Sequence, residues 1–335
     1  LHPVAHSFPT RRSSDLLDPS GTFETFGLRV PDGESLLLVG GNVDIVGGWL
    51  VAIGGRIDIG GLKEPGSVAL NRVEDLVQLS FPANSQKADV SLSNDARLTV
   101  RGDGGGDIAI NASNLNIFSD SEIYAGIGPG LGNQETRAGD INLLVENDMN
   151  LREGSLIYNY IDRNAMGIGG DVIINTGQLT LTEGSQLGAL VFGNGSAGNV
   201  QISATGSVTL DGRSSATDPR SFPSAIYNRL LGGGEGRSGD ITIQSENLTI
   251  SNRAQIASTT EGLGPSGDIL LDVEDKTLLE NSIIISEVTE NIGIGDAGNI
   301  IIDTTTLELI NGSALLADTE NLGDAGNIII RASEQ

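Results

Sequence analysis

The sequence predicts an all-β protein: a right-handed parallel β-helix in which each coil contributes about three short strands. Two observations carry this prediction. A unit of roughly thirty residues recurs along the chain, and apolar residues alternate with polar residues inside each unit. Alternation with a period of two is typical of a strand with one buried face. One unit cannot bury its apolar face alone, so successive units are expected to stack, with the right-handed crossover that parallel strands prefer.

The unit is clearest at residues 238–266. Gly239 and Asp240 open it, and three short runs of alternating aliphatic residues follow. Glycine, asparagine, serine and proline separate these runs, as turns require. The aliphatic positions of the three runs are Ile241, Ile243, Leu248, Ile250 and Ile256. The unit is therefore expected to hold three strands and three turns.

A glycine followed by aspartate or asparagine opens every unit from residue 106 onward. The pairs are Gly106 and Asp107, Gly139 and Asp140, Gly170 and Asp171, Gly198 and Asn199, Gly239 and Asp240, Gly267 and Asp268, Gly298 and Asn299, and Gly326 and Asn327. Successive glycines are 33, 31, 28, 41, 28, 31 and 28 residues apart. We interpret the pairs as turn anchors whose side chains form a hydrogen-bonded ladder at one corner, with cation binding as the alternative.

The aliphatic positions keep a nearly constant distance from each anchor glycine. They lie two, four, nine, eleven and seventeen residues past it, so that Leu156, for example, is expected to point inward. Two units shift the second run by one residue, and Lys276 interrupts the second run of another. The pattern predicts columns of stacked aliphatic side chains inside the molecule.

The chain divides into four segments. Residues 1–16 lack alternation, hold both histidines, and resemble a translated sequencing adapter, so we interpret them as non-native. Residues 17–62 are a glycine-punctuated β segment, residues 63–105 a transition β segment, and residues 106–335 the repeats, whose C-terminal end is expected to be truncated. Paired glycines at 40/41, 47/48, 54/55 and 60/61 are expected to bend the backbone with positive φ.

Composition excludes several classes of function. The net charge is −25, and the few cationic residues are scattered, which argues against a nucleic-acid partner. The chain has no cysteine, which excludes disulfides and thiol chemistry. No stretch approaches the roughly 20 apolar residues of a membrane-spanning helix. Binding, scaffold and polysaccharide-degrading functions all stay open on composition alone.

Residues 35–62, SLLLVGGNVDIVGGWLVAIGGRIDIGGL, resemble the end of the amino-terminal secretion domain of filamentous haemagglutinin-type exoproteins. Together with the stretch from Phe81 onward and the AGD/AGN repeats, they are similar to the large cyanobacterial members of that group. The resemblance implies that residues 17–62 end a truncated secretion domain. It also implies export by two-partner secretion, through an outer-membrane transporter, to the surface of a Gram-negative-type bacterium. The asparagine-proline recognition motifs of the family are absent from this sequence, so no secretion-signal residue is assigned.

Two places could hold a ligand. Asp103 and Asp107 lie in the glycine-rich turn RGDGGGD and could offer oxygen atoms to calcium, the one cofactor that the sequence suggests. One unit is 41 residues long, and its additional residues fit the segment 211–224. We expect this segment to project from one corner as a binding loop. The candidate binding residues of this loop are Asp211, Arg213, Asp218, Arg220 and Phe222.

The function implied by the resemblance is that of an adhesin-like exoprotein, which binds a cell-surface glycan or protein along its length and is not an enzyme. Two alternatives stay open. The chain could be a passive stalk for a further C-terminal module. It could also be a polysaccharide-degrading β-helix enzyme, which would need convergent carboxylates in one groove.

Overall fold

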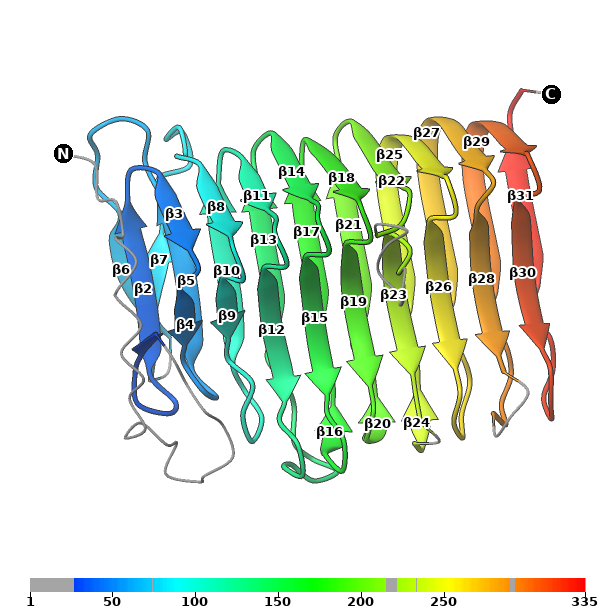
Figure 1. Cartoon of the computed structure of the whole chain (residues 1–335), viewed down its shortest axis with the longest axis horizontal. Helices are drawn as coiled ribbons and strands as arrows, with labels where there is room; N and C mark the ends of the chain where they lie inside the picture. Colours follow the sequence, from blue (N-terminus) through cyan, green and yellow to red (C-terminus); the bar gives the residue numbers. More distant parts are fainter. Residues whose placement is uncertain (1–26, 74, 215–221, 233, 290–292, 335) are drawn as a thin grey trace.

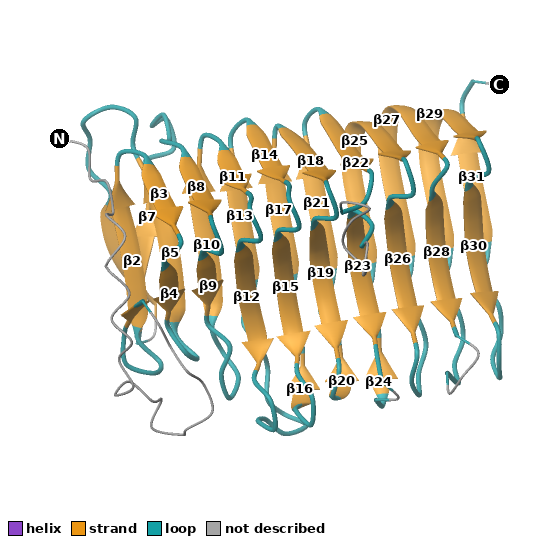
Figure 2. Ribbon diagram, in the orientation of Figure 1, coloured by secondary structure: helices purple, strands orange, loops and turns teal. Residues whose placement is uncertain are grey.

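The computed structural model describes residues 27–73, 75–214, 222–232, 234–289 and 293–334. Within these residues every regular element is a β-strand and none is a helix (Figure 2). All strand pairs except one are parallel, because only β6 and β7 pair in the antiparallel sense among the named strands. The prediction of an all-β protein built mainly of parallel strands is confirmed.

A ten-stranded parallel sheet runs the length of the molecule, and Figure 1 shows its strands side by side from the blue end to the red end. It contains the third run of each sequence unit. In spatial order its strands are β1 (Leu28–Arg29), β4 (Trp49–Val51), β9 (Arg97–Thr99), β12 (Glu122–Ile127), β15 (Leu156–Ile161), β19 (Gln186–Val191), β23 (Ala225–Leu230), β26 (Gln255–Thr260), β28 (Ile283–Val288) and β30 (Ala314–Thr319).

A sixteen-stranded sheet contains the first and second runs of each unit. Its strands are β2 (Ser35–Gly40), β3 (Val43–Val46), β5 (Arg56–Gly61), β8 (Val90–Ser93), β10 (Asp107–Ala112), β11 (Leu115–Ile117), β13 (Ile141–Val145), β14 (Asp148–Leu151), β17 (Val172–Thr176), β18 (Gln178–Thr182), β21 (Val200–Ala204), β22 (Ser207–Asp211), β25 (Ile241–Ser251), β27 (Ile269–Glu280), β29 (Ile300–Ile310) and β31 (Ile328–Ala332). In β25, β27 and β29 the two runs join into one long strand.

Two smaller sheets lie outside the two large ones. A three-stranded parallel sheet, β16 (Met166–Ile168), β20 (Asn194–Ser196) and β24 (Gly236–Arg237), lies after the third run of three units. A hairpin of β6 (Ala69–Val73) and β7 (Leu76–Ser80) leaves the repeat pattern and packs against β2 and β5. Its β7 backbone is held by side chains of those strands: Leu79 N–H donates to Asp58 Oδ2 (2.8 Å) and Val77 N–H donates to Ser35 Oγ (2.8 Å).

Strand pairing follows the sequence repeat residue by residue. The first aliphatic position of each unit pairs with its counterpart in the next unit. This column runs through Ile108, Ile141, Val172, Val200, Ile241, Ile269, Ile300 and Ile328. Because equivalent positions face each other across every pair, the period-two pattern of one unit is carried into all the others.

Two positions depart from the predicted register by one residue. Ile157, not Leu156, pairs with Ile123 and is fully buried, because the extra residue that shifts the second run of that unit also shifts the third. In β27 a register shift between Val273 and Lys276 moves Lys276 off the inner column. Its ammonium instead pairs with the Glu308 carboxylate (2.8 Å).

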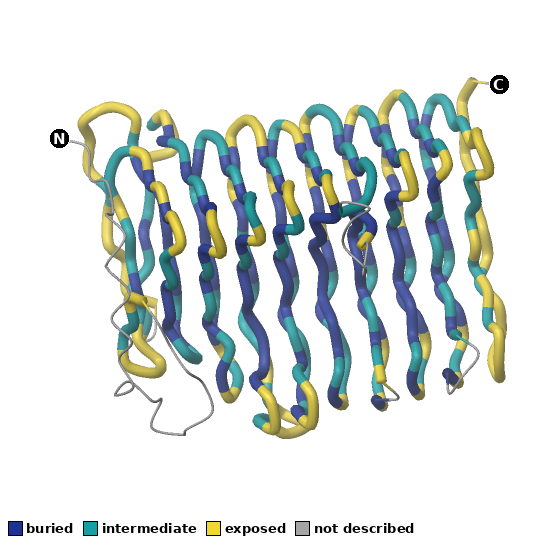
Figure 3. The backbone as a smooth tube through the Cα atoms, viewed as in Figure 1, coloured by how far each residue is buried: buried dark blue, intermediate teal, exposed yellow. Residues whose placement is uncertain are grey.

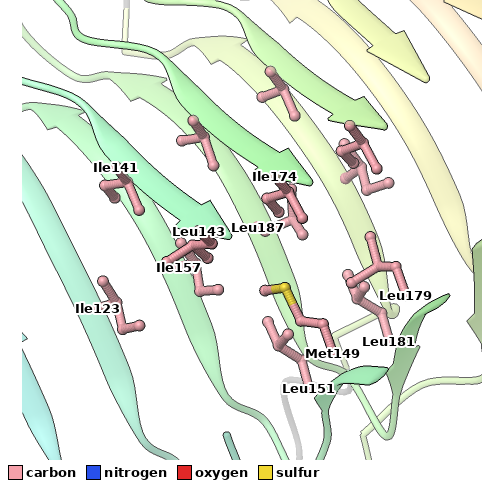
Figure 4. Close-up of a cluster of buried hydrophobic side chains, with 14 of the residues drawn as sticks. Ile123, Ile141, Leu143, Met149, Leu151, Ile157, Ile174, Leu179, Leu181 and Leu187 are labelled. Atoms are coloured by element: carbon pink, nitrogen blue, oxygen red, sulfur yellow. The ribbon is translucent and has the colours of Figure 1, made fainter. Parts of the chain in front are cut away.

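The aliphatic columns form one continuous core between the two large sheets. It extends from Leu36 to Ile302, and Figure 4 shows a section in which the side chains from neighbouring strands stack on one another. Leucine, isoleucine and valine fill these positions, and most of them are fully buried. Figure 3 shows the buried interior continuing from strand to strand, with exposed residues concentrated at the turns and at the two ends.

The glycine-punctuated segment belongs to the same two sheets as the repeats, since β2 pairs with β5 and β5 pairs with β10. Among its paired glycines, only Gly47 and Gly54 have positive φ, both +62°. The expectation of positive φ at all four pairs was therefore wrong. At Gly55 and Gly61 the constraint is close approach instead, because an added Cβ would lie 2.0 Å from Glu34 O and 2.1 Å from Gly41 O, respectively.

From Gly170 onward the anchor glycines share this constraint of close approach. A Cβ added at Gly267 would lie 2.1 Å from the carbonyl oxygen of Gly239, the preceding anchor. The corresponding distances at Gly170, Gly198, Gly239, Gly298 and Gly326 are 2.0 to 2.1 Å. Real Cβ atoms do not approach a carbonyl so closely, so any other residue would force neighbouring units apart.

We therefore predict that Gly267→Ala lowers the free energy of unfolding by about 2 kcal/mol or more. Gly41→Ala is the matched control, since Gly41 has no positive φ and no atom lies within 4 Å of its added Cβ. The control is expected to change stability by less than about 1 kcal/mol. Urea unfolding followed by circular dichroism measures both variants, and equal losses would contradict the close-approach argument.

Ile241→Asp should be much more damaging than Thr242→Asp. Ile241 is fully buried in the inner column, so the substitution places an unpaired carboxylate among aliphatic side chains and should cost more than about 3 kcal/mol. Thr242 lies on the opposite face of the same strand and is partly exposed. Its substitution should change the free energy of unfolding by about 0.5 kcal/mol or less. Similar losses in thermal melts of the two variants would show that the inside and outside faces are wrongly assigned.

Candidate functional site

The ten-stranded sheet carries an aromatic cluster on the face turned away from the main core. All four tyrosines of the chain lie there: Tyr124 on β12, Tyr158 and Tyr160 on β15, and Tyr227 on β23. Tyr124, Tyr158 and Tyr227 belong to a hydrophobic cluster separate from the main core, against which Tyr160 and Phe192 pack. We call these five residues the aromatic face. Their strands lie in the centre of the row in Figure 1.

Four rings of the aromatic face, those of Tyr124, Tyr158, Tyr160 and Phe192, are linked by ring contacts. The Tyr160 centroid lies 5.2 Å from that of Tyr124, at an interplanar angle of 62°, and 5.3 Å from that of Tyr158. The Phe192 ring lies 6.0 Å from the Tyr160 ring at 36°. Edge-to-face and tilted contacts of this kind are favourable for aromatic rings. Tyr160 is therefore the centre of the cluster.

Arginine side chains pack over these rings. Arg101 lies over both Tyr124 (5.4 Å to the ring centroid) and Tyr160 (5.6 Å), and Arg229 lies over Tyr227 (5.2 Å). A planar guanidinium over an aromatic ring makes a favourable cation–π contact. Arg97 extends the pattern toward the N-terminal end, over the Trp49 and Tyr124 rings.

Each of these arginines also has a carboxylate partner. Arg101 Nη1 lies 2.8 Å from Asp162 Oδ2, and Arg229 Nη2 lies 3.2 Å from Glu261 Oε1. Arg97 pairs with Glu122 in the same way. The guanidinium groups are thus fixed between a ring and an acid, which holds the surface of the aromatic face in one arrangement.

A surface cavity of about 250 Å³ opens on the aromatic face. Its lining comes from four neighbouring strands, β9, β12, β15 and β19, and the segments that follow them: Arg101, Tyr124, Tyr160, Asp162, Arg163 and Phe192. The Arg163 backbone N–H donates to Asp162 Oδ1 (2.8 Å), which orients the carboxylate toward Arg101. The cavity therefore combines aromatic rings, hydroxyl groups, one ion pair and one exposed guanidinium.

The tyrosine hydroxyls of this face stay protonated. Burial raises the pKa of Tyr124 and Tyr160 above the ordinary value of 10, and the nearby Arg101 only partly offsets this effect on the Tyr160 pKa. Burial also raises the pKa of Tyr158 and Tyr227. Neutral phenol groups can donate and accept hydrogen bonds at every physiological pH, which suits recognition of hydroxylated or anionic ligands.

The base of the predicted binding loop lies at the edge of the aromatic face. Gln186 links them, because its Nε2 donates to Pro223 O (3.1 Å) while its Oε1 accepts the hydroxyl of Tyr158. Arg213 and Pro223 form an antiparallel bridge, and Ser214 N–H donates to Phe222 O (2.8 Å). The two ends of the loop are thus fixed beside Tyr158.

The candidate residues of the loop have different surroundings. Asp211 Oδ1 accepts hydrogen bonds from Ser251 Oγ and Asn252 Nδ2, both at 2.6 Å, so this carboxylate joins two neighbouring units. Phe222 is exposed. Asp218 and Arg220 lie outside the described residues, as do residues 1–16.

The anchor aspartates and asparagines form a continuous hydrogen-bonded ladder. At each step the side-chain Oδ1 of one anchor accepts the backbone N–H of the next, as between Asp107 and Asp140 (2.9 Å) and between Asp140 and Asp171 (2.8 Å). The seven steps from Asp107 to Asn327 have distances of 2.6 to 3.0 Å. At this corner, side-chain hydrogen bonds therefore link equivalent residues of successive units, as backbone hydrogen bonds do in the sheets.

The two calcium candidates are engaged in separate contacts. Asp103 Oδ1 accepts the backbone N–H of Gly132 (2.8 Å), and Asp107 Oδ2 pairs with Arg56 Nη1 (3.1 Å). Across the part of the chain that the structure describes, no three histidine, cysteine or acidic side chains are grouped so that they could hold a metal ion. The geometry does not bring Asp103 and Asp107 into a cation site.

The aromatic face was missed by the sequence reasoning, although a signal was present. Tyr124, Tyr158 and Tyr227 each follow the inward aliphatic residue of the third run directly. Aligning the units on that run would have placed the three rings in one outward column. The low overall aromatic content hid this concentration.

Comparison of the chain with protein-family models, with curated proteins and with solved structures finds no match. Among the described residues, no helix has the length and apolar character that crossing a membrane requires.

The ladder leads to a prediction about pH. Burial raises the pKa of Asp140, and the neighbouring Asp171 and Asp107 carboxylates raise it further, although the Asp171 backbone N–H acts in the opposite direction. A raised pKa in the folded state means that the stabilising contribution is present at low pH and is lost as the pH rises through that pKa. Asp140→Asn should therefore be more stable than the parent protein near neutral pH, and this gain should vanish under acidic conditions.

Urea unfolding at several pH values measures this effect. Asn199 and Asn299 occupy equivalent ladder positions, so the amide can keep the Oδ1 acceptor. Asp148→Asn, at an exposed position of β14 outside the ladder, is the control. We also expect the melting temperature to be unchanged by calcium or EDTA. A loss of stability in Asp140→Asn, or a calcium-dependent melting temperature, would favour cation binding at the ladder.

Proposed function

We propose that the chain is a right-handed parallel β-helix with three strands per coil, which acts as an adhesin-like binding protein. The parallel pairing of equivalent positions from unit to unit supports the helical arrangement. The handedness rests on the strong general preference of parallel crossovers for the right-handed form. In this architecture every coil adds one strand to the outward face of the ten-stranded sheet, which can display binding groups in a row.

The observation that carries the binding function is the cavity on the aromatic face. Ligand sites in proteins combine apolar or aromatic walls with a few well-placed polar groups, and this cavity has both. The faces of aromatic rings suit the C–H faces of sugar rings, while the Arg101–Asp162 pair offers donors and acceptors to sugar hydroxyls. We therefore propose a glycan as the ligand, with Tyr160 and Phe192 as the stacking residues.

Location and export rest on the resemblance of residues 35–62 to the secretion domain of filamentous haemagglutinin-type exoproteins. On this basis we propose that the protein is carried by an outer-membrane two-partner-secretion transporter to the cell surface or the medium. A cysteine-free chain is compatible with passage through an oxidising compartment. The net charge of −25 would limit association of the displayed molecules with one another.

The arrangement favours binding over catalysis. Asp162 is the one carboxylate in the cavity lining, and it is held by Arg101 at 2.8 Å. Glycoside hydrolysis generally requires two carboxylates on either side of the scissile bond. A polysaccharide-degrading enzyme would release reducing sugars and would lose that activity on replacement of Asp162. A passive stalk would bind no ligand on this face.

We predict that Phe192→Ala weakens glycan binding by about tenfold or more, equivalent to about 1.4 kcal/mol. Phe118→Ala is the matched control, because Phe118 is partly buried like Phe192 but packs on Arg152 (4.9 Å), outside the aromatic face. A glycan array with the full chain identifies ligands, and calorimetry measures both variants. Absence of glycan binding, or equal binding by Phe192→Ala and the parent protein, would rule out the proposed site.

A further inference from the structure

We propose that the cavity on the aromatic face selects a sugar that carries an oxyanion, a uronate carboxylate or a sulfate ester, and that Arg163 binds this group. The inference rests on the proposed glycan-binding function and specifies its ligand class. Two observations support it: Arg163 lies in the cavity lining, and its side chain, unlike that of Arg101, is not bound to another group among the described residues.

Arg163 is the arginine of the cavity whose side chain is available. Within the described part of the chain, its guanidinium makes no hydrogen bond, ion pair or ring contact, and the residue is exposed. Arg101, which also lines the cavity, is already bound between Asp162 and two tyrosine rings. Of the two guanidinium groups that line the cavity, that of Arg101 forms part of its wall, and that of Arg163 is available to bind a ligand.

The backbone of Arg163 is held in place although its side chain is exposed. Its N–H donates to Asp162 Oδ1 (2.8 Å), and the carbonyl oxygen of the same residue accepts the N–H of Gly130 (3.0 Å) from the preceding unit. The side chain therefore starts from a fixed point at the cavity edge. This anchoring reduces the conformational freedom that a ligand would have to remove.

The charge balance of the lining favours an anion. Two guanidinium groups stand against one carboxylate, and that carboxylate is neutralised by Arg101. The cavity is thus locally cationic on a chain whose net charge is −25. A planar guanidinium can donate two parallel hydrogen bonds to a carboxylate or sulfate, which makes arginine well suited to such groups.

The aromatic residues supply the second contact that a sugar acid requires. Tyr160 and Phe192 line the cavity together with Arg163, and their tilted rings lie 6.0 Å apart. The Tyr124 and Tyr160 hydroxyls remain protonated, because burial raises the pKa of both groups, so they add no negative charge that would repel the ligand. A pyranose ring against these side chains can direct an acidic substituent to Arg163, whereas a free anion would gain nothing from the rings.

The test compares three sets of oligosaccharides of matched length: neutral, uronate-containing and sulfated. Calorimetry with the full chain should show at least tenfold tighter binding of one or both anionic sets than of the neutral set. Arg163→Gln should remove this preference and leave the affinity for neutral ligands unchanged. It should also weaken the dependence of affinity on salt concentration, because one ligand–guanidinium ion pair is lost.

Arg152→Gln is the control, because Arg152 packs on Phe118, away from the aromatic face. Phe192→Ala should weaken binding of neutral and anionic ligands alike. Binding of neutral and anionic sugars with equal affinity, or an anionic preference that persists in Arg163→Gln, would overturn this inference but leave the glycan-binding function standing. Failure of all three sets to bind would overturn both. A uronate preference without a sulfate preference, or the reverse, would identify which oxyanion the site recognises.

Discussion

The structure depends on the close stacking of backbone at the anchor glycines. Neighbouring strands in a sheet are roughly 4.8 Å apart, and at the corner this spacing leaves no room for a side chain between consecutive units. An added Cβ would lie about 2 Å from the preceding anchor carbonyl at Gly170, Gly198 and Gly239. The aspartate or asparagine that follows each glycine then hydrogen-bonds to the next unit. Glycine permits the approach, and its neighbour fixes the register.

The backbone N–H and C=O groups of the anchor glycines also form hydrogen bonds with buried polar side chains, which the aliphatic pattern does not reveal. Asn228 is fully buried, and its side chain joins two anchors, donating to Gly198 O (2.7 Å) and accepting the N–H of Gly239 (2.9 Å). In the following units Ser258 and Ser286 replace asparagine at this position. Buried backbone groups need such partners, because an unpaired one would cost as much as a lost hydrogen bond. The core thus combines aliphatic columns with a polar column at one corner.

The candidate site uses the regularity of the scaffold. Outward positions of neighbouring units fall side by side, so Tyr124 on β12 and Tyr158 on β15 pair directly, although they are far apart in the sequence. Tyr160 then contacts both rings and Phe192. A stack of repeated units can build a binding surface in this way from single outward residues of successive units. The inward positions stay unchanged, so the surface varies at little cost to stability.

The sequence by itself determined the strand pattern, the parallel stacking and most of the inward residues. Alternation and a constant repeat length can be read along the chain without knowing which distant residues are in contact. It did not determine the one-residue shifts at Ile157 and Lys276. An extra residue, in a turn or inside a long strand, can be assigned to a position only when the pairing with the neighbouring strand is known. The tertiary structure alone decided the ring contacts and the cavity of the aromatic face. Tyr124, Tyr160 and Phe192 become one site only when three units stack, and Arg163 is distinguished from Arg101 only by which partner lies within reach.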